Sequence, residues 1–198
     1  TAIDTGDENT FLGYDAGAGN TTGGLNIFIG SNSAKTNGGA SQNVAVGSYS
    51  LYQQNHSTIQ GSTTIGHYSL YSQTTGQSNT VLGRFTAYNL TTGEGNVIIG
   101  SLASSFNSAA ITTGDDNIII GNNAQASSAT VSNEITLGNS SSSTLRCNTQ
   151  TISSLSDRRD KTDINTLDLG LDFVKSLNPV KFKWQTRDGN GKDGSISA

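Results

Sequence analysis

A short run of strand-forming residues that ends in a glycine recurs along most of the chain and constrains the fold more than any other feature. The motif glycines stand at positions 13, 30, 47, 66, 83, 100, 121 and 138, so successive motifs lie 17, 17, 19, 17, 17, 21 and 17 residues apart. Such regular spacing indicates stacked units, in which each unit covers the apolar surface of its neighbours. An asparagine usually precedes the motif, a Thr-Thr-Gly turn usually leads into it, and a small residue stands three positions after the glycine.

Each unit is too short for a helix with its connections, and its apolar residues are mostly β-branched or aromatic, which favours a short strand. The sequence therefore predicts about eight stacked coils over residues 1–145. We expect the residue before each glycine to form one inward ladder, with the residue two positions earlier on the same side. We expect the asparagines to hydrogen-bond turn backbone across coils. The predicted inward ladder is Leu12, Ile29, Val46, Ile65, Leu82, Ile99, Ile120 and Leu137.

A coil of this length buries only two or three side chains, which is a thin core for a free-standing chain. Oligomerisation is the usual remedy, so we expect a parallel homotrimer with the ladders near a shared axis. The fold class is mainly β: a repetitive β-solenoid, a β-roll or an interwound β-helix. The repeat unit resembles the head repeats of trimeric autotransporter adhesins and the β-stacked shafts of phage tail fibres.

Composition excludes several classes of function. The chain has 24 glycines, one proline, one cysteine (Cys147) and a net charge of −4. These values argue against collagen, a disulfide scaffold and a general nucleic-acid binder. No apolar run reaches the roughly 20 residues of a spanning helix, so we expect no membrane insertion. The absence of methionine, even at residue 1, leads us to expect a part of a longer polypeptide.

Two other side-chain patterns are candidates for binding sites. His56 and His67 lack acidic or cysteine partners at ligand spacing, so we expect no metal, and no motif calls for a cofactor. Aromatic residues occupy two equivalent repeat positions, and we interpret them as rings that stack along the solenoid rather than as a platform for sugars. The two sets are Tyr49, Tyr68 and Phe85, and Tyr52, Tyr71 and Tyr88.

The composition changes at about residue 146. Residues 151–198 carry eight basic and seven acidic groups and the only proline and tryptophan, as in ordinary globular domains. We expect a connector over 146–156 and the start of a small α+β module over 157–198. Its elements would be a helix from about residue 166 to Asn178-Pro179 and a strand around Phe182.

Two segments carry a second resemblance: Ser156-Asp157-Arg158-Arg159-Asp160-Lys161-Thr162-Asp163-Ile164 and Leu177-Asn178-Pro179-Val180-Lys181-Phe182-Lys183-Trp184. Together they resemble the endosialidase-type intramolecular chaperones of phage tailspikes and tail fibres. Such modules drive trimerisation of a β-rich fibre and then cut themselves off. The later helical part of the family's domain has no counterpart in this sequence, so the module is expected to be incomplete.

The resemblance implies a cutting dyad of Ser156 and Lys161. A serine hydroxyl is a weak nucleophile until a base removes its proton, and a lysine serves as that base only if its pKa is lowered. The hydroxyl reaches the carbonyl of Leu155 through a five-membered ring, so we expect scission at the Leu155–Ser156 bond. Scission at Ser156–Asp157 is the alternative. The chain would be at most a single-turnover autoprotease.

These features predict a structural phage tail fibre or spike, assembled in the host cytoplasm, carried on the virion and bound to a host surface receptor of glycan or protein. The alternative is a bacterial trimeric surface adhesin that does not cut itself. A third reading, an ice-binding solenoid, is weak because the threonine pairs are adjacent, whereas ice binders need a flat Thr-x-Thr face.

Overall fold

The structure is a computed structural model that describes residues 6–55, 61–146 and 177, and it divides the chain into two units, Thr1–Arg146 and Cys147–Ala198. The first unit contains the whole repeat region. The helix and strand predicted beyond residue 146 lie outside the described residues, apart from the isolated Leu177.

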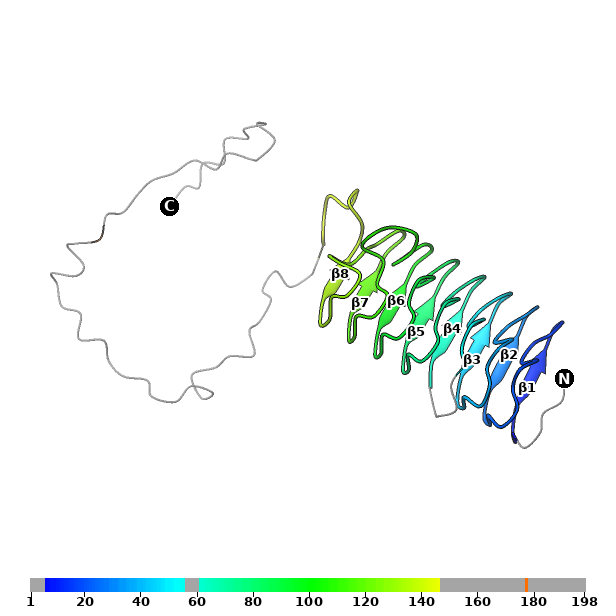
Figure 1. The fold of residues 1–198 in the computed structure, drawn as a ribbon. Helices are drawn as coiled ribbons and strands as arrows, with labels where there is room; N and C mark the ends of the chain where they lie inside the picture. Colours follow the sequence, from blue (N-terminus) through cyan, green and yellow to red (C-terminus); the bar gives the residue numbers. More distant parts are fainter. Residues whose placement is uncertain (1–5, 56–60, 147–176, 178–198) are drawn as a thin grey trace, which may run out of the picture. The chain divides into compact units, whose positions relative to one another are not determined.

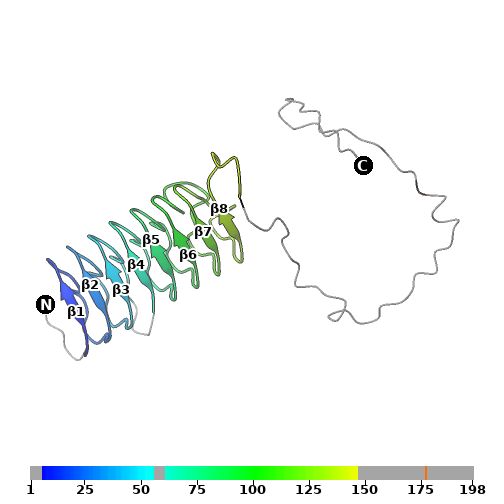
Figure 2. The same cartoon turned by 180° about the vertical axis from the view of Figure 1, so that it is seen from behind.

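The described part of the first unit is a parallel β-solenoid with eight strands and no helix, which confirms the predicted fold class. Each motif forms one three-residue strand, and consecutive strands pair in parallel in the order β1 to β8 (Figures 1 and 2). Equivalent residues of neighbouring strands pair in register, as where Val81 of β5 lies opposite Ile98 of β6. The strands are β1 (Thr10–Leu12), β2 (Ile27–Ile29), β3 (Val44–Val46), β4 (Thr63–Ile65), β5 (Thr80–Leu82), β6 (Val97–Ile99), β7 (Ile118–Ile120) and β8 (Ile135–Leu137).

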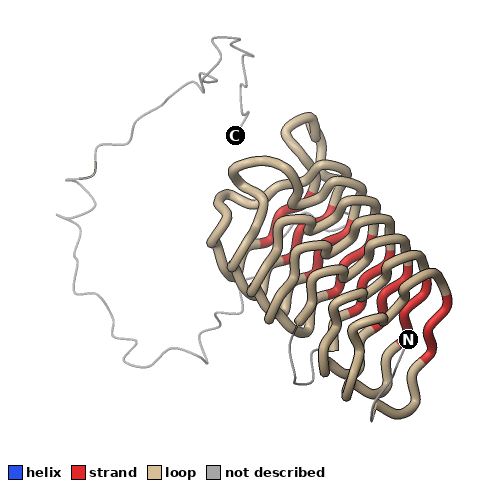
Figure 3. Tube along the Cα trace, turned by 45° about the vertical axis from the view of Figure 1, so that its right-hand side comes forward, coloured by secondary structure: helices blue, strands red, loops and turns tan. Residues whose placement is uncertain are grey.

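The core lies behind the middle residue of each strand, so the predicted inward ladder is wrong by one position. Ile98 is fully buried, whereas Leu12 is 66% exposed and Leu82 is 46% exposed. None of the eight residues before the motif glycines is buried within the chain. The strands line one wall and the loops close the rest of each coil (Figure 3). Side chains from the loops, including Leu51, Leu70, Leu90 and Ile111, fill the space behind the middle row.

The alternation of side chains in a strand explains this outcome. A one-residue shift in register moves a whole row to the opposite face. Strands of parallel sheets are commonly apolar on both faces, so the hydrophobic pattern of a three-residue strand does not indicate which face packs against the core. The buried middle row includes Ala45 and Thr64, while larger aliphatic side chains stand on the outer face.

A ladder of buried asparagines joins one coil to the next, as expected from the sequence. The side chain of Asn26 donates to the carbonyl of Ala40 at 2.9 Å, and its Oδ1 accepts the backbone N–H of Asn43 at 2.9 Å. Asn79, Asn96 and Asn117 repeat this pattern. These bonds satisfy polar backbone groups that the coil buries, which would otherwise cost about 1–3 kcal/mol each.

The motif glycines let the coils approach closely at the end of each strand. Gly100 has a φ of 131°, and a Cβ on it would lie 2.3 Å from the carbonyl oxygen of Gly121. Only glycine adopts this backbone conformation at low cost in this space. The part of the chain that the structure describes contains no helix long and apolar enough to cross a lipid bilayer.

Candidate functional sites

The predicted cutting dyad, Ser156 and Lys161, and the predicted scission site at Leu155, Ser156 and Asp157 lie outside the described residues. The chemistry assigned to them therefore stays a prediction from the sequence. The sites described below belong to the solenoid, residues 6–55 and 61–146.

The outer face of the sheet is a continuous aliphatic surface. Each strand contributes its first and third residues, so sixteen positions point away from the core, and none of them is buried. Thirteen of the sixteen are Val, Ile or Leu, and the other three are Thr10, Thr63 and Thr80. No charged side chain interrupts this surface, which we call the outer sheet face. Exposed apolar patches of this kind mark interaction surfaces in soluble proteins.

Two columns of aromatic rings follow the glycine turns of the central coils, and the rings stack along the solenoid as predicted. Tyr49, Tyr68 and Phe85 form one column, with ring centroids 4.7 and 5.2 Å apart and planes within 4° and 12° of parallel. Tyr52, Tyr71 and Tyr88 form the second column, with centroids 5.1 and 4.9 Å apart and planes within 3° and 2°. We call the two together the aromatic columns.

The columns are neighbours, because rings of the same coil lie close across them. Tyr68 and Tyr71 have centroids 5.3 Å apart and planes 44° apart. Phe106, from the longer turn between β6 and β7, lies across one end, 5.3 Å from Phe85 and 4.8 Å from Tyr88. The six rings of the columns are half-buried, and Phe106 is exposed.

Polar side chains also lie beside the columns. The Arg84 guanidinium lies 5.0 Å from the centre of the Phe85 ring, and the exposed His67 packs edge-on against Tyr68 at 4.4 Å. Burial raises the pKa of the Tyr71 phenol, and the neighbouring Tyr88 phenol raises it further. In the described part of the chain, the column tyrosines take part in no hydrogen bond through their hydroxyls.

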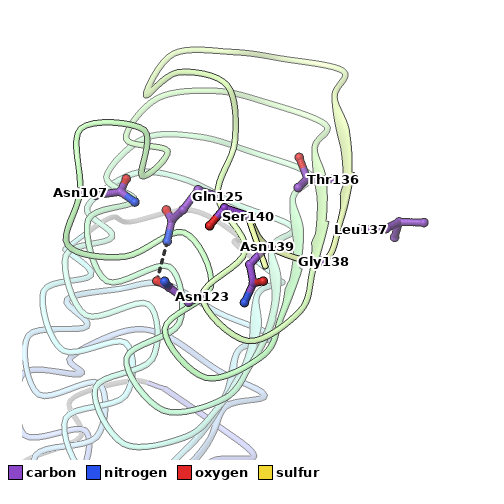
Figure 4. A pocket seen from close by; sticks show the side chains of 8 residues that line it. All are labelled: Asn107, Asn123, Gln125, Thr136, Leu137, Gly138, Asn139 and Ser140. Carbon is purple, nitrogen blue, oxygen red and sulfur yellow. Dashed lines mark hydrogen bonds between the residues drawn. The ribbon is translucent and has the colours of Figure 1, made fainter. Parts of the chain in front are cut away.

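A pocket of about 450 Å³ lies beside the last coil and β8 (Figure 4). Polar amides line it, and Gln125 donates to the Oδ1 of Asn123 at 3.3 Å. No ionisable side chain is among its lining residues, so it lacks a group for acid–base chemistry. Among the described residues no group of three or more His, Cys, Asp or Glu side chains could hold a metal ion, and His56 lies outside them.

One family model matches the segment that follows the solenoid in the sequence. Residues 156–196 match the family model of peptidase S74, the chaperone of endosialidase. The match includes both Ser156 and Lys161 and supports the chaperone module expected from the two sequence motifs. No curated protein matches the chain, and no solved structure matches it.

Proposed function

We propose that this chain is part of a phage tail fibre or spike, in which the β-solenoid is the fibre and the segment from residue 156 is an assembly chaperone. The observation that carries the proposal is the order of the two parts: a chaperone-of-endosialidase segment follows directly on a β-solenoid. The segment would bring three chains together, and the solenoids would then form side by side as a homotrimer. The mature fibre would be carried on the virion and would bind a host surface receptor.

The chaperone would be released by one intramolecular cut. Lys161 takes the proton from the Ser156 hydroxyl, and the oxygen attacks the carbonyl carbon of Leu155. The peptide bond between Leu155 and Ser156 breaks, and the amine of Ser156 leaves with the proton. Water then hydrolyses the ester that links Leu155 to the serine oxygen, so each chain is cut once.

Mass spectrometry of the protein expressed in full tests this assignment. The wild type should give two polypeptides that separate before Ser156, whereas Ser156→Ala and Lys161→Ala should each give one uncut polypeptide. Ser154→Ala and Lys175→Ala are matched controls that should be cut like the wild type. Processing of Ser156→Ala at the wild-type rate would show that the dyad is wrongly assigned.

Light scattering tests the assembly. The uncut Ser156→Ala protein should have the mass of three chains, because assembly precedes the cut in this scheme. A stable monomer with an intact β signal would contradict the trimer.

A further inference from the structure

The outer sheet face has no cover within the described residues of the solenoid, 6–55 and 61–146. Eight strands at about 4.8 Å spacing and about 10 Å of strand length give a face of about 34 by 10 Å, or about 340 Å² in outline. A stable interface usually buries about 800 Å² on each partner. The outer sheet face alone is therefore a small contact for two chains. In a ring of three, each chain would bury this face against one neighbour and a second surface against the other, so the area buried per chain would be greater than in a pair of chains that meet sheet to sheet.

Three-fold symmetry also calls for a second surface. Around a three-fold axis each interface is heterologous, so one surface of a chain meets a different surface of the next. The aromatic columns are a second surface of the described solenoid, made of half-buried rings. They have the same repeat along the chain as the outer sheet face, because both follow the stacking of the coils.

The two surfaces adjoin at the glycine turn. Within one coil only Gly83 and Arg84 separate Leu82, on the outer sheet face, from Phe85, in the first aromatic column. If the glycine turn lies at the three-fold axis, the outer sheet face lies on one side of the turn and the aromatic columns on the other. The residues before the motif glycines then lie nearest the axis, as the thin core of a single coil led us to expect.

The ring geometry favours a protein partner over a glycan. Within each column the rings cover one another's faces at 4.7–5.2 Å, so the columns present ring edges and hydroxyls. A sugar ring stacks on an exposed aromatic face, whereas aliphatic side chains also pack against ring edges. The outer sheet face offers such side chains and carries no charge that would lose its hydration there.

We propose that, in the trimer put forward above, the outer sheet face of each chain packs on the aromatic columns of the next chain. Because rotation about an axis parallel to the solenoid preserves height, each coil meets the same coil of its neighbour. On the outer sheet face of one chain, a residue far from the glycine turn meets a residue that is equally far from the glycine turn on the aromatic columns of the next chain. Thr80 of one chain therefore faces Tyr88 of the next, and Leu82 faces Phe85.

Disulfide trapping tests this pairing. Two versions of the full chain, both with Cys147→Ser, carry either Thr80→Cys or Tyr88→Cys, and one version has an added tag so that the products differ in size. Co-expressed and oxidised, the two versions should give a covalent dimer of one chain of each kind. Neither version alone should give a covalent dimer. Thr80→Cys paired with Tyr52→Cys, two coils away, is the matched control and should give little product.

The outcomes separate this inference from the proposed function. A covalent dimer from Thr80→Cys alone, in a protein with trimer mass, would show that the sheet faces meet one another and would overturn the pairing. A monomer mass would overturn the trimer itself. As a second measurement, acrylamide should quench tyrosine fluorescence poorly in the trimer. Columns that stay open to quencher and bind a soluble glycan would likewise overturn the pairing and identify them as a receptor site.

Tyr68→Ser supplies a test without cysteine. It should weaken the trimer at least tenfold in its dissociation constant. Thr92→Ala, at an exposed loop residue outside the outer sheet face, the columns and the glycine turn, should leave the constant unchanged. Equal effects of the two substitutions would contradict the pairing.

Discussion

The asparagine ladder makes a quantitative prediction about stability. The Nδ2 of Asn96 donates to the carbonyl of Gly114 at 2.9 Å, and its Oδ1 accepts the backbone N–H of Asn117 at 3.0 Å. Both groups are buried, and neither has another partner in the described part of the chain. Asn96→Ala would leave both unpaired. At about 1–3 kcal/mol for each unpaired group, the loss of unfolding free energy should be about 4 kcal/mol.

The ladder contains its own comparison. At Ser62 the chain has serine in place of asparagine, and the Ser62 hydroxyl accepts the backbone N–H of Asn79 at 3.2 Å. Asn96→Ser should therefore restore an acceptor for the Asn117 N–H and leave only the Gly114 carbonyl unpaired. About half of the loss, near 2 kcal/mol, should be recovered.

Guanidinium unfolding at one protein concentration, followed by far-ultraviolet circular dichroism, measures both changes. Asn89→Ala is the control, because this half-buried side chain makes no hydrogen bond to the described residues, and its effect should stay within about 0.5 kcal/mol. If Asn96→Ala stays as close to the wild type as Asn89→Ala does, or if Asn96→Ser is no more stable than Asn96→Ala, the unpaired groups do not determine the stability.

Three further predictions concern the core, the glycine turn and pH. Ile98→Ala should lower the free energy of unfolding by about 2–5 kcal/mol because it leaves a cavity at a fully buried site. Tyr14→Ala, at an exposed residue, should have the melting temperature of the wild type. Gly100→Ala should abolish cooperative thermal unfolding because its Cβ would strike the Gly121 carbonyl. Gly61→Ala, where a Cβ would meet nothing within 4 Å, should lower the free energy of unfolding by only about 1 kcal/mol. Equal effects of the two substitutions would contradict the close approach of the coils at Gly100. Hydrogen bonds from Ser127 and Thr136 lower the pKa of Glu134. The stability that this carboxylate contributes is therefore present above its unfolded-state pKa and is lost as pH falls through its folded-state pKa. If the melting temperature of Glu134→Gln falls as steeply as that of the wild type over this pH range, the assignment is contradicted.

The sequence predicts the number and position of the strands because the glycine repeat is a local signal. Each predicted motif is a strand that ends one residue before its glycine, and the stacked rings follow from equivalent positions in the repeat. The facing of the strands was predicted wrongly because both faces of Val97–Ile99 are aliphatic. Leu51 and Leu70, each four residues after a motif glycine, are the signal that was missed: large apolar residues there can fill only the space behind the strands.

The sequence predicts only part of the geometry of the aromatic columns. The equivalent positions of Tyr52 and Tyr71 predict stacking but not the tilt between the columns or the way Phe106 lies across their end. Those features depend on the path of the turn after each glycine, where Tyr49, Tyr68 and Phe85 all take positive φ values of 54–58°. This backbone conformation is uncommon for aromatic residues, so propensity gives no indication of it.

Irregularities in the repeat bear on how three identical chains would find the correct alignment. Nearly identical coils could slip by one unit and still pair strand with strand, since neighbouring units offer the same rows of side chains. The 19- and 21-residue units break this equivalence, and so do the serine in the asparagine ladder and the restriction of the aromatic columns to the central coils. A slip of one coil between chains would place an aliphatic strand that otherwise meets the rings against Asn32 and Lys35, or against Leu102, and would leave one aliphatic strand uncovered. The departures from the 17-residue period therefore favour the in-register trimer. Once the chaperone is cut away, a fibre aligned in this way would be retained kinetically, because the module that guided its assembly is no longer attached.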